Sequence, residues 1–572
     1  MSRRIVVIGG VALGPKAACR AKRVDPSADV YLIDRDEYIS YGGCGIPFYV
    51  AGDVSDEKEL RSTSFHMLRD ERFFLKDKGV TALTGTMATS IDRENKTVTI
   101  EKKDGTTESL AYDKLVLATG TSPRHLNLPG EDLKNVYTAA NMHDAIGIKE
   151  LVTAGNIEKA VVVGGGFIGL EMAEALADMW EIDTTIVEVT DQIMPGFVSS
   201  SFATMATRAI EENDVKVYTG ERVEAIVGKD GAVSAVKTDK RTLDADLVIM
   251  SVGVVPNTAL AKDAGLELSP QGLIMVNEHM QTSDPDIYSG GDCASVKNLI
   301  TEKPGYYPLG SMANRQGRVI GTNVAGGEAT LDGAVGSFVV KIFDKALAGA
   351  GLTVDRAKAE GFDAVGIQVA QFDRAHFYIE KEIIYLELVV DQKTRRVLGI
   401  QGFGGKDSGM LARINAVATI LKYKPEVDEI SNLEIAYSPP FASAMDIVNA
   451  LGNAAANYLD GRYKPMTMEE FQACWQDKNC DNTIFLDCRA NADAQPFEDA
   501  FPDFWKSIPH DQLADRIDEV PKDKKVVLVC NTGVRSYEAQ LNLDAAGLTD
   551  NVSVGAGVAG LKTWGVDFGL KK

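Results

Sequence analysis

Cys44 lies within a glycine-rich stretch, residues 40–47, that reads SYGGCGIP. Its three glycines allow the backbone to turn tightly and to approach a flat ring closely. Pro47 is typical of the first turn of a helix, so the thiol should lie at or just before a helix N-terminus. There the helix dipole favours a thiolate over a thiol. The stretch therefore predicts a reactive thiolate, and the simpler alternative is a buried structural cysteine in a turn.

A second cysteine, Cys530, directly follows a predicted buried strand, residues 525–529, and begins the segment CNTGVRS before a helix. Backbone N–H groups of this short loop would point at the sulfur, and Arg535 would close the ring. Another predicted strand in the same part of the chain begins at Thr483 and ends in Asp487-x-Arg489. The pattern predicts an anion or persulfide site, and the alternative is a structural cysteine.

The first of these thiols is preceded by a strand, a glycine turn, a helix and a second strand. Residues 4–8 (RIVVI) are a predicted buried strand, GGVALG follows from Gly9, and a helix covers about residues 15–24. The next strand, residues 29–33, ends in Asp34. This order is typical of a dinucleotide-binding βαβ unit, although Val11 stands where the middle glycine of GxGxxG belongs.

A second unit of the same kind begins at the predicted strand of residues 159–163, which runs into GGGFIG from Gly164. This is a complete GxGxxG, and the next strand ends in Glu188. The glycines allow a pyrophosphate to approach a helix N-terminus, and the acid would bind both ribose hydroxyls. Glu188 would repel a 2′-phosphate and no arginine directly follows it, so we predict a preference for NADH over NADPH.

Two dinucleotide motifs in one chain indicate a flavoprotein that takes hydride from a nicotinamide. A predicted strand near residue 287 ends in Gly291-Asp292, and Asp292 is expected to hold the ribityl or phosphate region of the flavin. Residues 307–309 and 313–317 would then pass the edge of the flavin ring.

The helix after the first glycine turn is basic on one face. Lys16, Arg20 and Arg23 are spaced by four and three residues, which places them together on that face. In an acidic protein such a face is usually only solvated. The alternative is a docking site for a phosphorylated substrate beside Cys44.

Length and composition limit the classes of function. At 572 residues the chain is too long for one core, so three or four domains are expected. A net charge of −22 argues against a general binder of nucleic acid or of anionic membranes. No apolar run approaches a membrane span and the chain enters a strand at once, so we expect a cytoplasmic protein. Seven scattered cysteines without CxxC pairs fit catalytic thiols in a reducing compartment and give no metal-site pattern.

Over nearly its whole length the chain resembles a known family. Residues up to about 450 are similar to the coenzyme A-disulfide reductase branch of the FAD/NAD-linked pyridine nucleotide-disulfide oxidoreductases, and residues from about 466 resemble a single rhodanese domain. The fusion is similar to the NADH-dependent coenzyme A-persulfide and polysulfide reductases. The motifs that carry the resemblance are the Gly9 turn, SYGG before Cys44, Thr119-Gly120, Gly164 to Gly169, Gly291-Asp292 and Tyr437-Ser-Pro-Pro.

The resemblance implies an α/β fold with two Rossmann-like domains for FAD and NADH, an α+β dimerisation domain and a C-terminal rhodanese-like α/β domain. It also implies a homodimer in which Tyr437 and its neighbours reach the flavin site of the other subunit. The predicted boundaries are 1–119 and 250–327 for the FAD-binding domain, 120–249 for the NADH-binding domain, 328–452 for the dimerisation domain, 453–465 for a linker and 466–572 for the rhodanese domain.

The resemblance also implies which residues contact the cofactors and coenzyme A. The predicted cofactor-binding residues are Gly9, Gly10, Ala12, Gly14, Asp34, Arg35, Thr119, Gly120, Asp292, Leu309, Ala313, Tyr437, Gly164, Gly166, Ile168, Gly169, Glu188 and Gly253. The predicted coenzyme A-binding residues are Lys16, Arg20, Arg23, Ser40, Gly43, Lys78, Asn314, Phe377 and Met445.

Three positions separate this chain from parts of that family. Tyr49 stands where glutathione-reductase-like members carry the second cysteine of CxxxxC, so Cys44 is expected to work alone. Phe377 and Met445 stand where the family has a tyrosine of the coenzyme A pocket and a lysine. The phenol that would donate a proton to a leaving thiolate is then missing. This favours a smaller or different persulfide or polysulfide substrate over coenzyme A disulfide.

The resulting hypothesis is an FAD-dependent NADH:persulfide or polysulfide reductase. Cys44, with a lowered pKa, attacks a sulfane chain or the outer sulfur of coenzyme A persulfide, and sulfide leaves. Cys530 takes sulfane sulfur as a persulfide, which Arg535 and the loop amides stabilise. The alternatives are a coenzyme A-disulfide reductase, an NADH oxidase or peroxidase in which Cys44 cycles through sulfenic acid, and a redox sensor or sulfur carrier. The first glycine turn lacks the histidine found in the oxidases and peroxidases.

Overall fold

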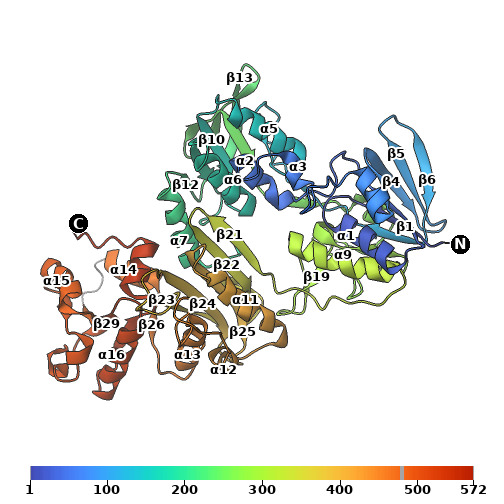
Figure 1. Ribbon diagram of the computed structural model, residues 1–572. Helices are drawn as coiled ribbons and strands as arrows, with labels where there is room; N and C mark the ends of the chain where they lie inside the picture. Colours follow the sequence, from blue (N-terminus) through green and yellow to red (C-terminus); the bar gives the residue numbers. More distant parts are fainter. Residues whose placement is uncertain (1, 477–481, 571–572) are drawn as a thin grey trace. The chain divides into compact units, whose positions relative to one another are not determined.

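The computed structural model describes residues 2–476 and 482–570 (Figure 1). The chain divides into two compact units, which are described separately. Unit 1 comprises Met1–Asp191 and Asp214–Ala334, and unit 2 comprises Gln192–Asn213 and Val335–Lys572.

The first sheet of unit 1 is parallel and has the strand order β18-β7-β1-β2-β3. Its alternating aliphatic residues are buried on both faces, as expected for a parallel sheet covered by helices. Helices α1 (Leu13–Val24) and α9 (Gly310–Val324) pack against each other at Gly317 and Gly321. A Cβ at Gly321 would lie 2.4 Å from the Ala17 carbonyl oxygen, so only glycine permits this close crossing. The strands are β1 (Arg4–Ile8), β2 (Asp29–Ile33), β3 (Thr81–Leu83), β7 (Lys114–Leu117) and β18 (Ile287–Ser289).

The second sheet of unit 1 is also parallel and has the order β12-β11-β10-β16-β9. Helices α5 (Met142–Thr153) and α6 (Phe167–Ala177) belong to this part of the chain. Unit 1 also has two three-stranded antiparallel sheets: β4 (Thr86–Asp92), β5 (Thr97–Lys102) and β6 (Thr107–Ala111), and β13 (Val223–Lys229), β14 (Ala232–Thr238) and β15 (Thr242–Asp244). Two two-stranded antiparallel sheets pair β8 (Thr121–Pro123) with β17 (Val254–Pro256) and β19 (Val296–Lys297) with β20 (Pro304–Gly305). The parallel strands are β9 (Val136–Tyr137), β10 (Lys159–Val163), β11 (Asp183–Val187), β12 (Lys216–Tyr218) and β16 (Leu247–Met250).

Unit 2 contains an antiparallel sheet with the order β21-β22-β25-β24-β23. Every residue of β25 is buried, so this strand forms the centre of the core. The strands are β21 (Phe338–Ile342), β22 (Lys345–Gly351), β23 (Ala364–Phe372), β24 (Ile383–Asp391) and β25 (Val397–Gly405), and the helices are α7 (Ser200–Glu211), α10 (Val354–Ala359), α11 (Met410–Ile420), α12 (Val427–Ser431) and α13 (Ile447–Leu459). Residues 453–459, in the predicted linker, are the second half of α13.

The C-terminal part of unit 2 has a parallel sheet with the order β26-β30-β29-β27-β28. Its core is rich in aromatic rings, and Phe485 stacks on Trp505 with 5.3 Å between ring centroids. The strands are β26 (Pro465–Met466), β27 (Thr483–Asp487), β28 (Trp505–Ser507), β29 (Lys525–Val529) and β30 (Asn551–Val554), and the helices are α14 (Met468–Gln476), α15 (Asn491–Ala500), α16 (Val534–Ala545) and α17 (Gly557–Trp564).

Polar contacts join this C-terminal sheet region to the rest of unit 2. The Tyr385 hydroxyl of β24 lies 2.8 Å from the Thr563 hydroxyl and donates to the Ala559 carbonyl oxygen at 3.2 Å, both on α17. Ser200 and Ser201 of α7 both donate to the Glu469 carboxylate of α14. The two sheets of unit 2 are therefore held together by specific side chains.

In residues 2–476 and 482–570, no helix has both the length and the apolar composition needed to cross a membrane. The same residues contain no group of three or more histidine, cysteine, aspartate or glutamate side chains placed to hold a metal ion.

Candidate active site

Cys44 lies in a short 3₁₀ turn, Gly43–Gly45, directly before helix α2 (Ile46–Ala51). Pro47 is in the first turn of α2, as the sequence predicts. The thiol is exposed. A Cβ at Gly310, the first residue of α9, would lie 3.7 Å from the Cys44 sulfur. The thiol therefore lies beside the N-terminus of α9, at van der Waals distance from the position that a Cβ of residue 310 would occupy.

The electrostatic surroundings of Cys44 differ from the prediction of a lowered pKa. Partial burial raises the pKa of the Cys44 thiol, and the carboxylates of Glu171 and Asp292 raise it further. Burial and the neighbouring Glu174 also raise the pKa of Glu171 to about 7. The protein's own groups thus disfavour the thiolate, because burial penalises the charged form and two acidic side chains repel it.

The first glycine turn has the close contacts that a dinucleotide requires. Gly9 has a φ of +111°, and a Cβ there would lie 2.0 Å from the Ala118 carbonyl oxygen. A Cβ at Gly14 would lie 1.8 Å from the Gly9 carbonyl oxygen. The Gly10 N–H donates to the Asp34 carboxylate at 2.5 Å, so the acid at the end of β2 lies directly beside the turn. These residues fit an FAD pyrophosphate and ribose.

The other predicted FAD residues of unit 1 lie on neighbouring elements. Asp292 follows β18, and burial raises the pKa of its carboxyl to about 6. The buried Tyr306 hydroxyl near it has no hydrogen-bond partner in the part of the chain that the structure describes. Such an unpaired polar atom fits a site that receives a polar ligand. Ala12 and Arg35 flank the first turn, Thr119 and Gly120 follow β7, and Leu309 and Ala313 lie at the start of α9.

The second glycine turn has the same construction and one open position. A Cβ at Gly169 would lie 1.9 Å from the Gly164 carbonyl oxygen, whereas a Cβ at Gly166 would meet no atom within 4 Å. The Glu188 carboxylate accepts a hydrogen bond from the Gly165 N–H at 2.8 Å. The open space at Gly166, at the N-terminus of α6, fits the pyrophosphate of a nicotinamide dinucleotide. Ile168 lies in the first turn of α6, and Gly253 follows β16 with a φ of +98°.

The basic face of α1 gains a residue from another segment. Arg23, Lys78 and Lys16 are all close enough to Cys19 to lower its pKa, although burial raises that pKa overall. The structure therefore brings Lys78 to the side chains of Lys16 and Arg23. The Arg20 guanidinium, on the same helix, donates to the Thr322 hydroxyl of α9 at 3.0 Å. We name Lys16, Arg20, Arg23 and Lys78 the basic face.

The thiol-proximal residues predicted to contact coenzyme A also lie in unit 1. Ser40 is buried with a φ of +53°, and its N–H donates to the Gly10 carbonyl oxygen, which joins the Cys44 stretch to the first glycine turn. Gly43 is exposed beside Cys44. Asn314 lies on α9 and donates to the Gly310 carbonyl oxygen at 2.9 Å.

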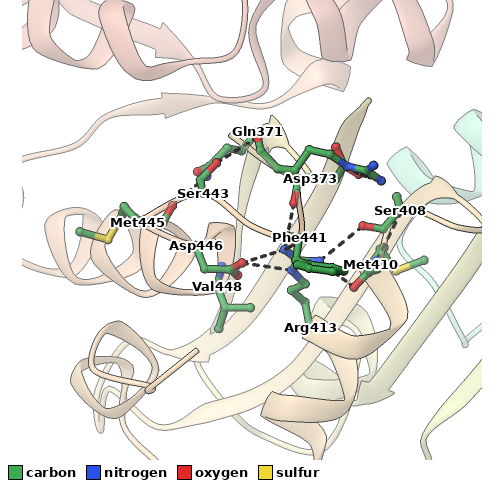
Figure 2. Close-up of polar contacts among 12 residues, drawn as sticks. Gln371, Asp373, Ser408, Met410, Arg413, Phe441, Ser443, Met445, Asp446 and Val448 are labelled. Atoms are coloured by element: carbon green, nitrogen blue, oxygen red, sulfur yellow. Dashed lines mark hydrogen bonds and ion pairs between the residues drawn. The ribbon is translucent and has the colours of Figure 1, made fainter. Parts of the chain in front are cut away.

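The remaining predicted residues lie in unit 2, on two loops that are clamped together (Figure 2). Arg413 of α11 is buried, and its guanidinium donates to the Asp446 carboxylate at 2.9 and 3.1 Å. It also donates to the carbonyl oxygens of Asp373 at 2.9 Å and Phe441 at 3.1 Å. Gln371 donates to the Met445 carbonyl oxygen at 2.8 Å. Arg413 therefore fixes the loop after β23 against the loop before α13, and sequence reasoning gave no sign of this residue.

The two clamped loops present apolar side chains on the surface of unit 2. The exposed fractions are 65% for Phe377, 48% for Tyr437, 75% for Phe441 and 56% for Met445. Exposed apolar groups gathered on rigid loops are typical of a protein interface.

Cys530 lies at the end of β29 in the predicted cradle. Its sulfur accepts a hydrogen bond from the Gly533 N–H at 3.1 Å and lies 3.4 Å from the Ser536 hydroxyl. Gly533 has a φ of +102°, and a Cβ there would lie 2.2 Å from the Gly555 carbonyl oxygen, so the loop requires glycine. Arg535 lies in the first turn of α16. The Arg489 guanidinium donates to the Asp487 carboxylate at 2.7 Å, and both side chains are buried. That pair lies at the end of β27.

The pyridine nucleotide-disulphide oxidoreductase family matches residues 3–317, and the dimerisation domain of the same family matches residues 337–448. An NAD(P)H sulfur oxidoreductase (CoA-dependent) of Pyrococcus abyssi is 36% identical over 450 residues, which cover 78% of this chain and 96% of that protein.

Two solved structures match over almost the full length. An NAD-dependent persulfide reductase from A. fulgidus has a TM-score of 0.91 and 37% identity, covering 97% of this chain and 99% of its own. The reduced form of Bacillus anthracis CoADR-RHD has a TM-score of 0.89 and 31% identity, covering 99% of this chain and 98% of its own. These matches confirm the predicted fold class: two Rossmann-like domains, a dimerisation domain and a C-terminal rhodanese-like domain.

Proposed function

Because the chain belongs to the pyridine nucleotide-disulphide oxidoreductase family, we propose that it is an FAD-dependent NADH:persulfide or polysulfide reductase that releases sulfide through Cys44. The observation that carries the proposal is an exposed cysteine, Cys44, in the unit that also contains both glycine turns. Tyr49, in the place of a second redox cysteine, is buried, so Cys44 would exchange with an external sulfur compound. Relatives named for sulfur and persulfide reduction support this substrate class.

FAD, when bound, supplies the transfer of two electrons from NADH to oxidised Cys44. The residues of the first glycine turn with Asp34 would hold it, and those of the second turn with Glu188 would hold NADH. The Cys44 thiolate attacks the substrate. Attack on the carbon-bound sulfur of a persulfide expels hydrosulfide and leaves a mixed disulfide, whereas attack on the terminal sulfur expels the thiolate and leaves a Cys44 persulfide. Either product needs two electrons to restore the thiolate.

The basic face gives a binding site for a phosphorylated carrier of that sulfur. Lys16, Arg20, Arg23 and Lys78 carry positive charge in a chain of net charge −22, and ammonium and guanidinium groups bind phosphate oxygens. Ser40, Gly43 and Asn314 would meet the thiol end of the carrier. The coenzyme A dependence printed for the Pyrococcus abyssi relative supports coenzyme A as this carrier.

The match to the family's dimerisation domain supports a homodimer. Tyr437, Phe441, Met445 and Phe377 would then be covered by a second copy of the chain and would reach its flavin site. Phe377 and Met445 offer neither a proton nor a positive charge, which favours a persulfide or polysulfide over coenzyme A disulfide. The C-terminal domain would load sulfane sulfur on Cys530, with Arg535 beside it. Such thiol chemistry suits the reducing cytoplasm.

Measuring NADH oxidation together with sulfide release also distinguishes two alternative functions. A coenzyme A-disulfide reductase would consume NADH with the disulfide and release no sulfide. An NADH oxidase or peroxidase would consume NADH only with oxygen or peroxide.

The test is the stoichiometry of sulfide release. Under anaerobic conditions with coenzyme A persulfide, we expect one sulfide for each NADH oxidised, and we expect Cys44→Ser to abolish NADH oxidation together with the sulfide release coupled to it. NADH oxidation without sulfide, or sulfide release by Cys44→Ser at the rate of the unmodified protein, would contradict the proposal. Separately, a Cys530→Ser protein that uses the natural sulfur donor equally well would exclude the role proposed for Cys530.

A further inference from the structure

A second buried cysteine, Cys488, lies beside Cys530. Strands β27 and β29 are parallel neighbours and end at the same register position, Asp487 opposite Val529. The pairing extends one residue further, because the Cys488 N–H donates to the Val529 carbonyl oxygen at 2.8 Å. Cys488 and Cys530 are thus the next residues of two adjacent strands, and neighbouring strands lie about 4.8 Å apart. This spacing is within the range of Cα separations that disulfides span.

The side chains of the two cysteines leave the sheet on the same side. Ile484, Leu486 and Cys488 of one strand pack in one core cluster with Val526 and Leu528 of the other. Because alternate residues of a strand share a face, Cys530 follows Leu528 on this side. The Cys488 thiol is 1% exposed and its only hydrogen bond among the described residues is a long one, 3.8 Å, to the Leu486 carbonyl oxygen.

The charged groups that shift the pKa of Cys488 lie in and around the Cys530 site. Burial raises the pKa of the Cys488 thiol, and the neighbouring Cys530 and Asp487 raise it further, whereas Arg535 lowers it. Cys488 is therefore electrostatically coupled to both proposed catalytic groups of this domain. It stays protonated while Cys530 reacts with a sulfur donor.

We propose that Cys488 is the resolving thiol of Cys530: it attacks the persulfide formed on Cys530, releases hydrogen sulfide, and leaves a Cys488–Cys530 disulfide. The inference rests on the sulfur capture proposed above for Cys530. It adds an activity to this domain, namely NADH-independent release of sulfide.

The step is balanced without a further oxidant. The Cys488 sulfur forms a bond to the inner sulfur, Sγ of Cys530, and the bond from that sulfur to the outer sulfur breaks. The outer sulfur leaves as hydrosulfide and takes the proton of Cys488. The sulfane sulfur is reduced and the two cysteines are oxidised to the disulfide. Two thiols of low molecular weight, such as coenzyme A, then reduce this disulfide and become oxidised themselves.

The geometry of the cradle directs the attack to the inner sulfur. Sγ of Cys530 is held by the Gly533 N–H and lies beside the Ser536 hydroxyl, at the strand end next to Cys488. Because a protonated buried thiol is a slow nucleophile, an external acceptor thiol takes the sulfur first when one is present. Cys488 acts when no acceptor arrives, and it prevents the persulfide from persisting.

The test is a single turnover of the full-length Cys44→Ser holoprotein, reduced, anaerobic, and free of NADH and added thiol. Thiosulfate is the sulfur donor, and one sulfite released for each chain reports loading of Cys530. We expect one sulfide for each sulfite and a peptide in which Cys488 is linked to Cys530. With Cys488→Val or Cys488→Ser added, sulfite release stays equal, sulfide release falls at least tenfold, and the mass of one added sulfur atom remains on Cys530.

A Cys530 persulfide that persists in the parent as long as in the Cys488→Val protein would overturn the proposal. A second arm, independent of sulfur capture, is oxidation of the same protein by oxidised glutathione. A Cys488–Cys530 disulfide supports the pairing, whereas glutathione retained on Cys530 beside a free Cys488 overturns it. If no sulfite is released in the first arm but the Cys488–Cys530 disulfide forms in the second, sulfur capture by Cys530 is rejected and the pairing of the two thiols is retained.

Discussion

The clamp formed by Arg413 and Asp446 leads to a prediction with a large expected effect. The two side chains are 8% and 3% exposed, and the guanidinium also serves four backbone carbonyl oxygens: those of Asp373, Phe441, Ser408 and Gly409. Asp446→Asn keeps the cap of α13, because asparagine and aspartate cap helices equally well, but it removes the partner of a buried charge. Breaking one partner of a buried ion pair costs about 3–5 kcal/mol.

This cost predicts a visible loss of stability and a local opening. For a domain of this size, about 3 kcal/mol corresponds to a fall in melting temperature of roughly 6 °C or more. The matched control is Asp428→Asn, which removes an exposed partner of Arg395 at 3.6 Å and should change the free energy of unfolding by less than about 1 kcal/mol. Because the clamp fixes the loop after β23, native-state trypsin should cleave after Arg374 or Lys381 faster in Asp446→Asn than in the control.

A double-mutant cycle tests the reasoning. Arg413→Met removes the charge, so adding Asp446→Asn to it should cost less than Asp446→Asn alone by about 2 kcal/mol or more. If the two effects add, or if Asp446→Asn melts with the unmodified protein, the pair does not act as a buried clamp.

Three further changes test other parts of the structure. Glu171→Gln removes a charge that raises the pKa of Cys44, so alkylation of the Cys44 thiolate in the holoprotein should reach its midpoint about half a pH unit lower or more; an unchanged midpoint would exclude this coupling. Gly166→Ala should fold and retain FAD, because its Cβ meets no atom, yet raise the KM for NADH at least about tenfold by filling the phosphate cradle; an unchanged KM would contradict the proposed NADH site. Tyr385→Phe removes a hydroxyl that bonds α17 at Thr563, so proteolytic release of the C-terminal domain should accelerate in accordance with a loss of about 1 kcal/mol; an unchanged rate would show that this contact does not hold the domain.

The local elements could be predicted from the sequence because glycine turns and aliphatic runs determine them locally. The strand expected at residues 4–8 is Arg4–Ile8, and the strand expected at 159–163 is Lys159–Val163. The helix expected at about residues 15–24 is Leu13–Val24, which begins two residues earlier. The sequence also places Cys44 before a helix, and α2 begins at Ile46. Asp34 and Glu188, the acids predicted to bind ribose, each accept a hydrogen bond from the adjacent glycine turn. Their contacts with the cofactors stay predictions.

What the sequence could not predict depends on residues far apart in the chain. The pKa of Cys44 is raised by burial and then by Glu171 and Asp292, which come from separate segments. No local spacing places Lys78 with Lys16 and Arg23; only the family resemblance predicted it there, and tertiary packing brings it to them. The register of β27 against β29 brings Cys488 to Cys530, and no local motif encodes such a pairing between strands.

The most direct test of the central claim is anaerobic NADH oxidation with polysulfide, coenzyme A persulfide and coenzyme A disulfide in parallel, for the unmodified protein and Cys44→Ser. Our account predicts fast turnover with the two sulfane substrates, little with the disulfide, and none with any of them in Cys44→Ser. Fast turnover with the disulfide alone, or no turnover until oxygen is admitted, would contradict it.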